Sequence, residues 1–276
     1  MIIKDMPKFE DKDKLFDWLA NNSEELIYEA KSTVKEADAM LIPATEIMDM
    51  KTETSKSVSG VIEPNEPGVI KARLVINTTN LMDSHKDVHI PGLWNKSLKE
   101  NKRIKHKQEH GHRFKDVIAD KEDLKAFTKE YEWKELGYDV EGKTEALVFD
   151  STIREKRNPE MYNEYKNGNV DNHSVGMQYV KMLMAMNSDK EEHAQYKINW
   201  DKYYPEVINK DEADRSGYFW PILEAKAREG SAVPDGSNHI TPTLSRKTHS
   251  EDGSEAAAKA LQIEEVKKFI NSLKIK

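Results

Sequence analysis

The chain has 276 residues, enough for one sizeable domain with appendages, and its 34% of charged residues is typical of a water-soluble protein. It contains no cysteine, which excludes disulfides, cysteine nucleophiles and thiolate metal sites, and it has no run of the roughly 18 apolar residues that a membrane span needs. We expect no membrane partner and, because the net charge is −7 despite the basic stretch 102–107, no nucleic-acid partner either.

The first 48 residues predict a helical N-terminal arm. Apolar residues recur at helical spacing within residues 11–38, between acidic and basic ones: Leu15, Leu19, Leu26, Ala30 and Val34. A polar interruption leaves two alternatives, one helix or two, the second of which would be capped by Ser23. Residues 49–68 are polar, contain two prolines and predict a linker.

Residues 69–244 predict a mixed core. Period-two alternation and apolar runs indicate strands, and other segments indicate helices. The expected strands are 70–77, 146–153, 174–183 and 218–229. A short helix is expected around Trp94, and another over 159–167, where Gly168 suits a left-handed C-cap. Residues 184–216 are too polar for a pair of core strands and predict an insertion, partly helical.

The C-terminal part predicts a linker followed by a helix. Residues 245–255 are low in apolar content and indicate a flexible linker. Residues 256–276 predict an amphipathic helix with Ile263, Val266 and Ile270 on one face. The expected organisation is therefore a core with helical appendages at both ends.

Ser174 is a candidate nucleophile within the segment NHSVGM at 172–177. A serine hydroxyl needs a base within hydrogen-bond reach, and Gly176 would allow close backbone approach two residues later. Asn172 stands where the nucleophile elbow of an α/β-hydrolase has glycine, so that motif is excluded.

Histidine is the natural base near neutral pH, and the segment HKQEHGH at 106–112 holds three of them. A metal site is an alternative, because His106 and His110 are four residues apart and His110 and His112 could face one side of a strand, but no HExxH pattern accompanies it. A second group, MDSHKDVH at 82–89, could bind a cation, but the sequence favours a turn with satisfied side chains. We therefore expect neither a metal nor another cofactor.

Four segments in a fixed order resemble the HK97-type prohead proteases of phages, which are similar in fold to the herpesvirus assembly proteases. The resemblance covers about residues 70–240 and leaves out both appendages. The segments are DSHKDV at 83–88 with PGLWNKSL at 91–98, EHGH at 109–112, NVDNHSVGM at 169–177 and LEAKAREGSAV at 223–233.

The resemblance implies that Ser174 is the nucleophile and His110 the base, with His112 as the competing base. His173 stands where the family has a small or apolar residue, which leaves an effect on Ser174 open, although adjacent residues on a strand point to opposite faces. Glu229 matches the recurrent glutamate of the family's E-x-S-x-V pattern. It also follows the row Leu223, Ala225 and Ala227 on one strand face, which points it inward, and an inward carboxylate needs a partner. We take it as the third catalytic residue, with Asp150 and then Asp116 as alternatives.

The resemblance also implies an α+β fold with an antiparallel β-barrel core surrounded by helices. The implied activity is that of a serine endopeptidase of capsid maturation, which cleaves scaffold and major capsid protein segments, and itself near 49–68 or 245–255. The implied place is the host cytoplasm, inside the assembling procapsid, with a homodimer left open. The alternative is a catalytically inactive capsid-scaffold or structural assembly protein.

Overall fold

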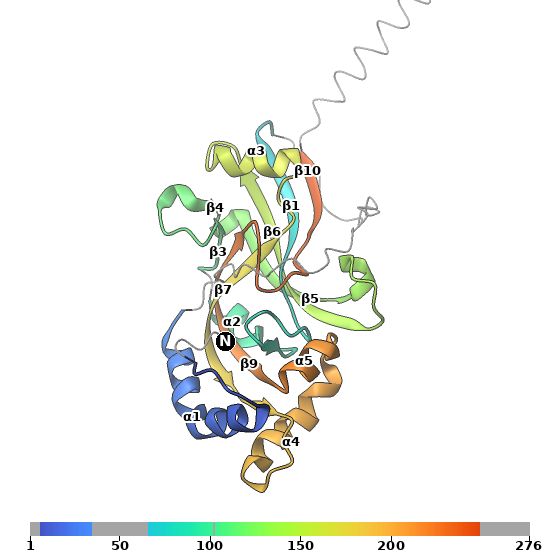
Figure 1. The fold of residues 1–276 in the computed structure, drawn as a ribbon. Helices are drawn as coiled ribbons and strands as arrows, with labels where there is room; N and C mark the ends of the chain where they lie inside the picture. Colours follow the sequence, from blue (N-terminus) through green and yellow to red (C-terminus); the bar gives the residue numbers. More distant parts are fainter. Residues whose placement is uncertain (1–5, 35–65, 102, 249–276) are drawn as a thin grey trace, which may run out of the picture.

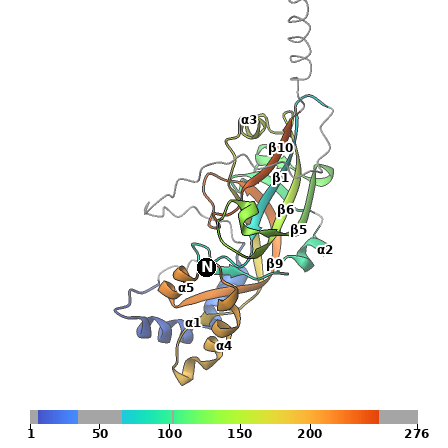
Figure 2. The same cartoon turned by 90° about the vertical axis from the view of Figure 1, so that its right-hand side faces the viewer.

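The protein is an α+β structure in which two β-sheets pack together and helices cover their ends (Figure 1). This computed structural model describes residues 6–34, 66–101 and 103–248. In these parts α3 lies at one end of the sheets, and α1, α4 and α5 lie at the other end (Figures 1 and 2). None of the helices in these ranges is both long enough and apolar enough to cross a membrane.

The first sheet has four strands in the order β10-β1-β6-β5, and all its neighbours are antiparallel. Its strands are β1 (Val69–Thr78), β5 (Leu124–Glu132), β6 (Lys143–Arg154) and β10 (Thr243–Thr248). The centre of this sheet is apolar, and Leu74, Leu147 and Phe149 are fully buried. The predicted strands at 70–77 and 146–153 are therefore confirmed, each a little longer than expected.

The second sheet has six strands and is organised around the long strand β9. Its strands are β2 (Asp87–His89), β3 (Lys105–Gln108), β4 (Val117–Ala119), β7 (His173–Met182), β8 (Ala185–Met186) and β9 (Tyr218–Ala232). β7 and β8 pair antiparallel with β9, whereas β2 and β3 pair parallel with it. The predicted strands at 174–183 and 218–229 are confirmed as parts of β7 and β9.

The described strands do not close into the antiparallel barrel that the resemblance implied. Their hydrogen bonds make two separate sheets, and β2 and β3 add parallel pairs that the expectation did not include. The two sheets nevertheless share one apolar core. Their close contact depends on Gly230 of β9, where a Cβ atom would lie 2.6 Å from Phe149 and 2.7 Å from Ile76 of the facing sheet.

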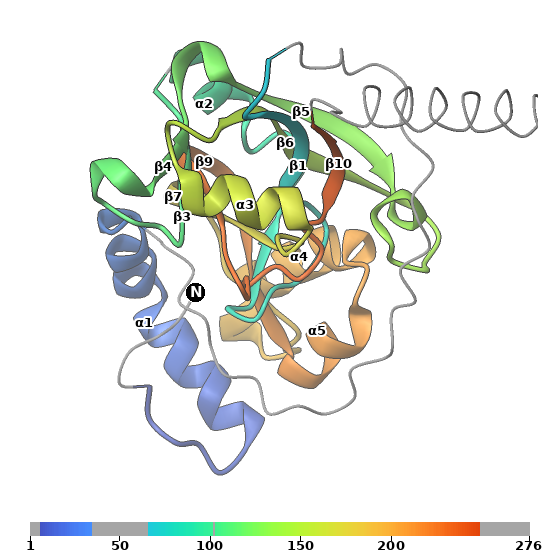
Figure 3. The ribbon, with the colours of Figure 1, turned by 90° about the horizontal axis from the view of Figure 1, so that it is seen from above.

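Of the predicted N-terminal arm the structure describes residues 6–34, and these contain one continuous helix, α1 (Lys12–Ser32), which packs on β7. Asp11 caps its start by accepting a hydrogen bond from the backbone N–H of Lys14 at 2.8 Å. The predicted second helix start at Ser23 is wrong, because Ser23 lies inside α1 and its hydroxyl contacts Tyr196 at 2.8 Å. Seen from above, α1 lies at the edge of the molecule, whereas α3 lies over the sheets (Figure 3).

Two short helices flank the strands of the core. α2 (Asn95–Glu100) follows the buried Trp94, close to the expected position. α3 (Pro159–Asn167) matches the predicted bounds, and Gly168 adopts the predicted left-handed C-cap with φ 85°. Short 3-10 turns connect other elements: Phe114–Asp116, Lys121–Asp123, Trp133–Leu136, Glu191–His193 and Tyr204–Glu206.

The predicted insertion at 184–216 is largely helical, as expected, but it is part of the packed structure. It contains α4 (Ala194–Tyr203) and α5 (Lys210–Ser216), together with the short strand β8. Its aromatic residues explain why it is ordered. Trp200 is buried and lies against Phe219 of β9, with ring centroids 5.1 Å apart.

The predicted linker at 245–255 is wrong over its first four residues. Residues 245–248 belong to β10, which pairs with β1 in a register that joins Thr248 to Ile70. The strand is not evident in the sequence because its side chains are polar. β10 lies at the edge of its sheet, where strands often carry charged and polar side chains. The predicted C-terminal helix at 256–276, most of the 49–68 linker and the rest of the 245–255 linker lie outside the described residues.

Candidate functional site

The candidate site lies where β3 and β7 flank the C-terminal end of β9. Both strands pair with residues 229–232, so they lie on opposite edges of β9. Glu229 and Ser231 are two residues apart on β9 and therefore point to the same face. Both are buried, as the apolar row leading to Glu229 predicted. The central strand thus presents a carboxylate and a hydroxyl between the segments that carry His110 and Ser174.

His110 follows β3 in an unusual backbone conformation. Glu109 and His110 have φ values of 49° and 54°, in the left-handed region that residues other than glycine rarely occupy. Three hydrogen bonds hold the turn: from Glu109 N–H to Ala232 O at 2.9 Å, from His110 N–H to Ser231 Oγ at 3.1 Å, and from Gly111 N–H to Gln108 O at 2.8 Å. Such conformations persist where the surrounding structure enforces them, and they cluster at functional sites.

The imidazole of His110 is bound to the carboxylate of Glu229. His110 Nδ1 lies 2.5 Å from Glu229 Oε1, and Ser231 Oγ donates to Glu229 Oε2, also at 2.5 Å. Because a carboxylate only accepts, Nδ1 must carry the hydrogen, which leaves the lone pair of the neutral ring on Nε2. Nε2 is buried and has no hydrogen-bond partner among the described residues. The ring is therefore oriented as a general base would be.

Ser174 lies at the start of β7, directly opposite Ser231 in the antiparallel register. Residues that face each other across such a pair share one face of the sheet, so Ser174 lies on the same face as Ser231 and Glu229. Ser174 is 5% exposed, and its hydroxyl makes no hydrogen bond within the described ranges. It lines a small cavity together with Asn77, His89 and other residues.

Gly176 explains how Glu229 fits beside β7. The two residues face each other in the register, and a Cβ atom on Gly176 would lie 2.0 Å from Glu229 Oε1. Any side chain at 176 would therefore occupy the position of the carboxylate. The glycine two residues after Ser174 is needed to make room for the partner of His110.

The structure separates the alternative site residues from this group. His112 is exposed, unlike His110. Asp150 forms a salt bridge with Arg73 at 2.7 Å, and Asp116 accepts from Arg113 at the start of a 3-10 turn. Neither carboxylate is bonded to His110, so among the predicted candidates only Glu229 is in place to orient that ring.

Two further histidines are joined in a buried chain of hydrogen bonds. His173 Nδ1 contacts Thr241 O at 2.8 Å, Tyr165 Oη lies 2.9 Å from His173 Nε2 and 3.0 Å from His106 Nε2, and His106 Nδ1 contacts Ser151 at 2.9 Å. Burial lowers the pKa of His173 to about 4 and that of His106 well below its usual value. Both rings are therefore neutral.

This chain answers two questions that the sequence left open. His106 uses both ring nitrogens on Ser151 and Tyr165, so the metal alternative that paired His106 with His110 is wrong. His173 points to the face opposite Ser174, as strand alternation predicts, and it does not act as a neighbouring base. Lys105 and Lys107 of the basic stretch lie within β3.

Sequence reasoning gave no role to Ser231. It bridges Glu229 and the backbone of His110, and it faces Ser174. The spacing Glu229-Gly230-Ser231 is the signal that could have identified it, because residues two apart on a strand share a face.

Comparison of the chain with protein-family models, with curated proteins and with solved structures finds no match.

Proposed function

We propose that the protein is a serine endopeptidase of phage capsid maturation, with Ser174 as nucleophile, His110 as general base and Glu229 as the residue that orients the base. The observation that supports it most is the His110–Glu229 pair, which leaves a buried, unpartnered Nε2 on the sheet face that also carries Ser174. A buried acceptor without a partner is rare and calls for a ligand or a reacting group.

The proposed reaction is acyl transfer to the serine. Ser174 Oγ attacks the scissile carbonyl carbon, and His110 Nε2 takes the hydroxyl proton. Glu229 stabilises the resulting imidazolium through the Nδ1–H bond. The imidazolium then gives the proton to the leaving amine as the C–N bond breaks, which forms an acyl-enzyme and releases the first product. Water, deprotonated by the same nitrogen, hydrolyses the ester and restores the serine.

The step requires Ser174 Oγ and His110 Nε2 to come within hydrogen-bond reach, about 2.6–3.2 Å. His110 Nε2 has no hydrogen-bond partner among the described residues, so this nitrogen breaks no existing bond when the two atoms meet. Catalytic hydrogen bonds are often long in the free enzyme and tighten when substrate binds. We propose that the bound peptide completes this contact.

We extend the proposal to the fold and to the cellular location in which the protein acts. The two packed sheets would be an open, elaborated relative of the herpesvirus-protease barrel, in which a carboxylate replaces the second histidine of those enzymes. The substrates would be scaffold and major capsid protein segments inside the procapsid. For self-cleavage we retain 49–68 and the part of 245–255 that follows β10, because residues 245–248 are paired with β1.

Intact-mass measurement of the concentrated full-length chain tests the proposal. We expect the wild type to trim itself, the Ser174→Ala and His110→Ala variants to stay whole, and a matched Ser245→Ala control in β10 to behave as wild type. If Ser174→Ala is trimmed like the wild type, Ser174 is not the nucleophile. If no chain is trimmed even when scaffold and capsid proteins are added, the protein is instead a non-catalytic assembly protein.

A further inference from the structure

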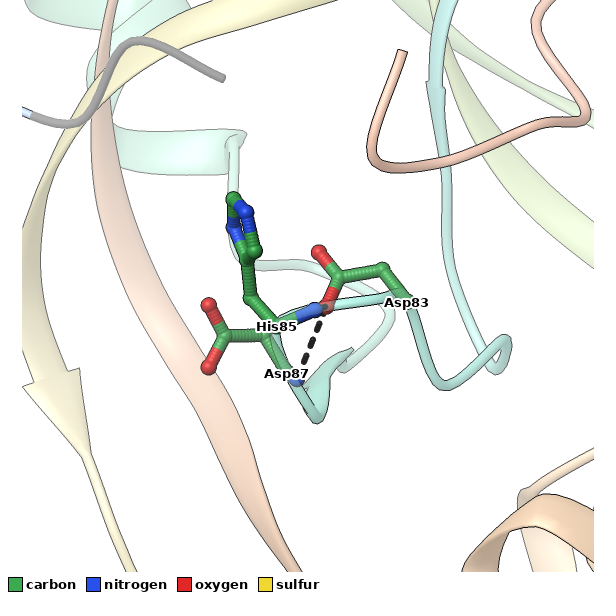
Figure 4. Close-up of side chains that lie close together, drawn as sticks. All are labelled: Asp83, His85 and Asp87. Carbon is green, nitrogen blue, oxygen red and sulfur yellow. Dashed lines mark hydrogen bonds between the residues drawn. The ribbon is translucent and has the colours of Figure 1, made fainter. Parts of the chain in front are cut away.

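A cluster of potential metal ligands lies in the turn that precedes β2 and at the first residue of that strand. Asp83, His85 and Asp87 each offer one ligand atom, and these atoms all lie within 4.8 Å of one another. Figure 4 shows the two carboxylates on either side of the His85 side chain. The sequence alone favoured a turn with satisfied side chains over a cation site at this group.

The turn holds both carboxylates firmly. Asp83 Oδ1 accepts hydrogen bonds from the backbone N–H groups of His85 at 2.8 Å and Asp87 at 2.9 Å. Asp87 Oδ2 accepts from the hydroxyl of Tyr179, which lies on β7 five residues after Ser174. The bond from Tyr179 connects the turn directly to the strand that carries the proposed nucleophile.

A second observation points to a ligand here. Asp83 and His85 line a cavity of about 20 Å³ whose wall also includes Asn77, His89 and Ser174. Asn77 is 1% exposed and His89 is 3% exposed. A hydrogen bond of 2.8 Å joins Asn77 Nδ2 to His89 Nδ1. Their other polar atoms, Asn77 Oδ1 and His89 Nε2, are buried and have no partner in the described ranges. Unpaired buried polar groups of this kind call for an ion or a water molecule.

The size of the cavity decides between occupants. A space of about 20 Å³ accepts roughly one water-sized particle, so it can hold an ion or a water but not a substrate side chain. One imidazole and two carboxylates suit a first-row transition metal better than Ca²⁺ or Mg²⁺, which prefer oxygen ligands alone.

We propose that Asp83, His85 and Asp87 bind one divalent transition-metal ion, Zn²⁺ or Mn²⁺, beside Ser174. Asn77 and His89 hydrogen-bond the waters that complete its coordination. The ion fixes the β2 turn against β7 through Asp87 and Tyr179, and so stabilises the wall of the cavity that Ser174 lines. The site does not depend on the proposed protease activity.

Calorimetric titration of the full-length, chelator-treated chain with Zn²⁺, Mn²⁺, Ca²⁺ and Mg²⁺ tests the site. We expect one equivalent of Zn²⁺ or Mn²⁺ to bind, with at least tenfold weaker binding in His85→Gln and Asp87→Asn. Both variants keep a hydrogen-bonding group of similar size. His112→Gln and Asp235→Asn, which change exposed residues of the same types, are the matched controls and should bind as wild type.

Two further measurements keep the outcome clear. Ser174→Ala should bind the metal with unchanged affinity, which separates a failure of this site from a failure of the proposed protease. The visible absorption of Co²⁺ should change when the ion binds the wild type, and this readout does not depend on whether a variant folds. The site would be refuted by sub-stoichiometric binding to the wild type, or by variants in the cluster that bind as tightly as the controls.

Discussion

His110 Nδ1 lies 2.5 Å from Glu229 Oε1, although 119 residues separate the two in the chain. The contact exists because β3 pairs parallel with β9 and the chain then turns back through two left-handed residues. The hydroxyl of Ser231 stabilises the same contact, because it accepts a hydrogen bond from the backbone N–H of His110 and donates one to Glu229. We therefore expect three different effects on catalysis: from removing the charge of Glu229, from filling the space beside Gly176, and from removing the hydroxyl of Ser231.

The charge of Glu229 should matter more for kcat than for folding. Glu229→Gln keeps the size and an acceptor for Nδ1–H but loses the negative charge that stabilises the imidazolium. We expect kcat to fall by roughly 10²–10⁴-fold, in line with the loss of a triad carboxylate elsewhere, with little change in KM. Steady-state cleavage of a peptide that spans the self-cleavage site measures this. Glu160→Gln, at an exposed position on α3, is the control, and an equal loss there would contradict the assignment.

The space beside β7 should be equally critical. In Gly176→Ala the new Cβ atom would meet Glu229 Oε1 at 2.0 Å, so the carboxylate must leave His110. We expect loss of activity together with about 1–3 kcal/mol of destabilisation, the usual cost of overpacking. Chemical denaturation and peptide cleavage measure the two effects.

Combining this change with Glu229→Asp provides the control for Gly176→Ala. The shorter carboxylate frees the space, so the double variant should regain stability but not activity. If Gly176→Ala alone is fully active, the carboxylate does not need its observed position.

Ser231 should act by positioning the base. Ser231→Ala leaves the buried N–H of His110 and one Glu229 oxygen without partners, which costs about 1–3 kcal/mol of folding free energy. Because the ring is then less well held, we expect kcat to fall while KM stays near its wild-type value, and the pH profile of kcat to shift. We expect a lower kcat in Ser231→Cys than in Ser231→Thr, because only threonine keeps a strong hydrogen-bond donor. Equal kinetics in all three variants would show that Ser231 has no positioning role.

Much of this site follows from local sequence rules, and the rest depends on long-range pairing. The alternation of side chains along a strand correctly predicted that Glu229 points inward and that His173 points away from Ser174. The left-handed turn at Glu109 and His110 could not be predicted, because neither residue is a glycine and tertiary hydrogen bonds enforce the conformation. The parallel pairing of β3 with β9 was equally inaccessible, since its partners lie more than a hundred residues apart and no local pattern encodes that choice. β10 was missed for a related reason, because its polar edge looks like a linker.

Tyr165 should contribute to stability by joining His106 and His173 in the buried chain of hydrogen bonds. Tyr165→Phe removes the hydroxyl that joins the two rings and leaves a nitrogen on each without a partner. The ring volume is unchanged, so no large cavity forms. We expect a loss of about 1–3 kcal/mol in the free energy of unfolding, measured by denaturant titration. Tyr162→Phe, in the same helix, is the matched control, and an equal loss there would show that the chain is not responsible.

The same chain should make the protein less stable in mild acid. Burial lowers the pKa of folded His173 to about 4, whereas an unfolded histidine titrates near 6.5. Between these values the unfolded state binds the additional proton, so stability rises with pH and falls as the pH drops from about 6.5 towards 4. At about pH 4, His173 alone should have lowered the free energy of unfolding by about 3 kcal/mol. The lowered pKa of His106 reduces it further in the same direction. In His173→Gln, urea denaturation over this range should show a smaller slope of stability against pH. A slope equal to that of the wild type would mean that His173 is already protonated in the folded protein.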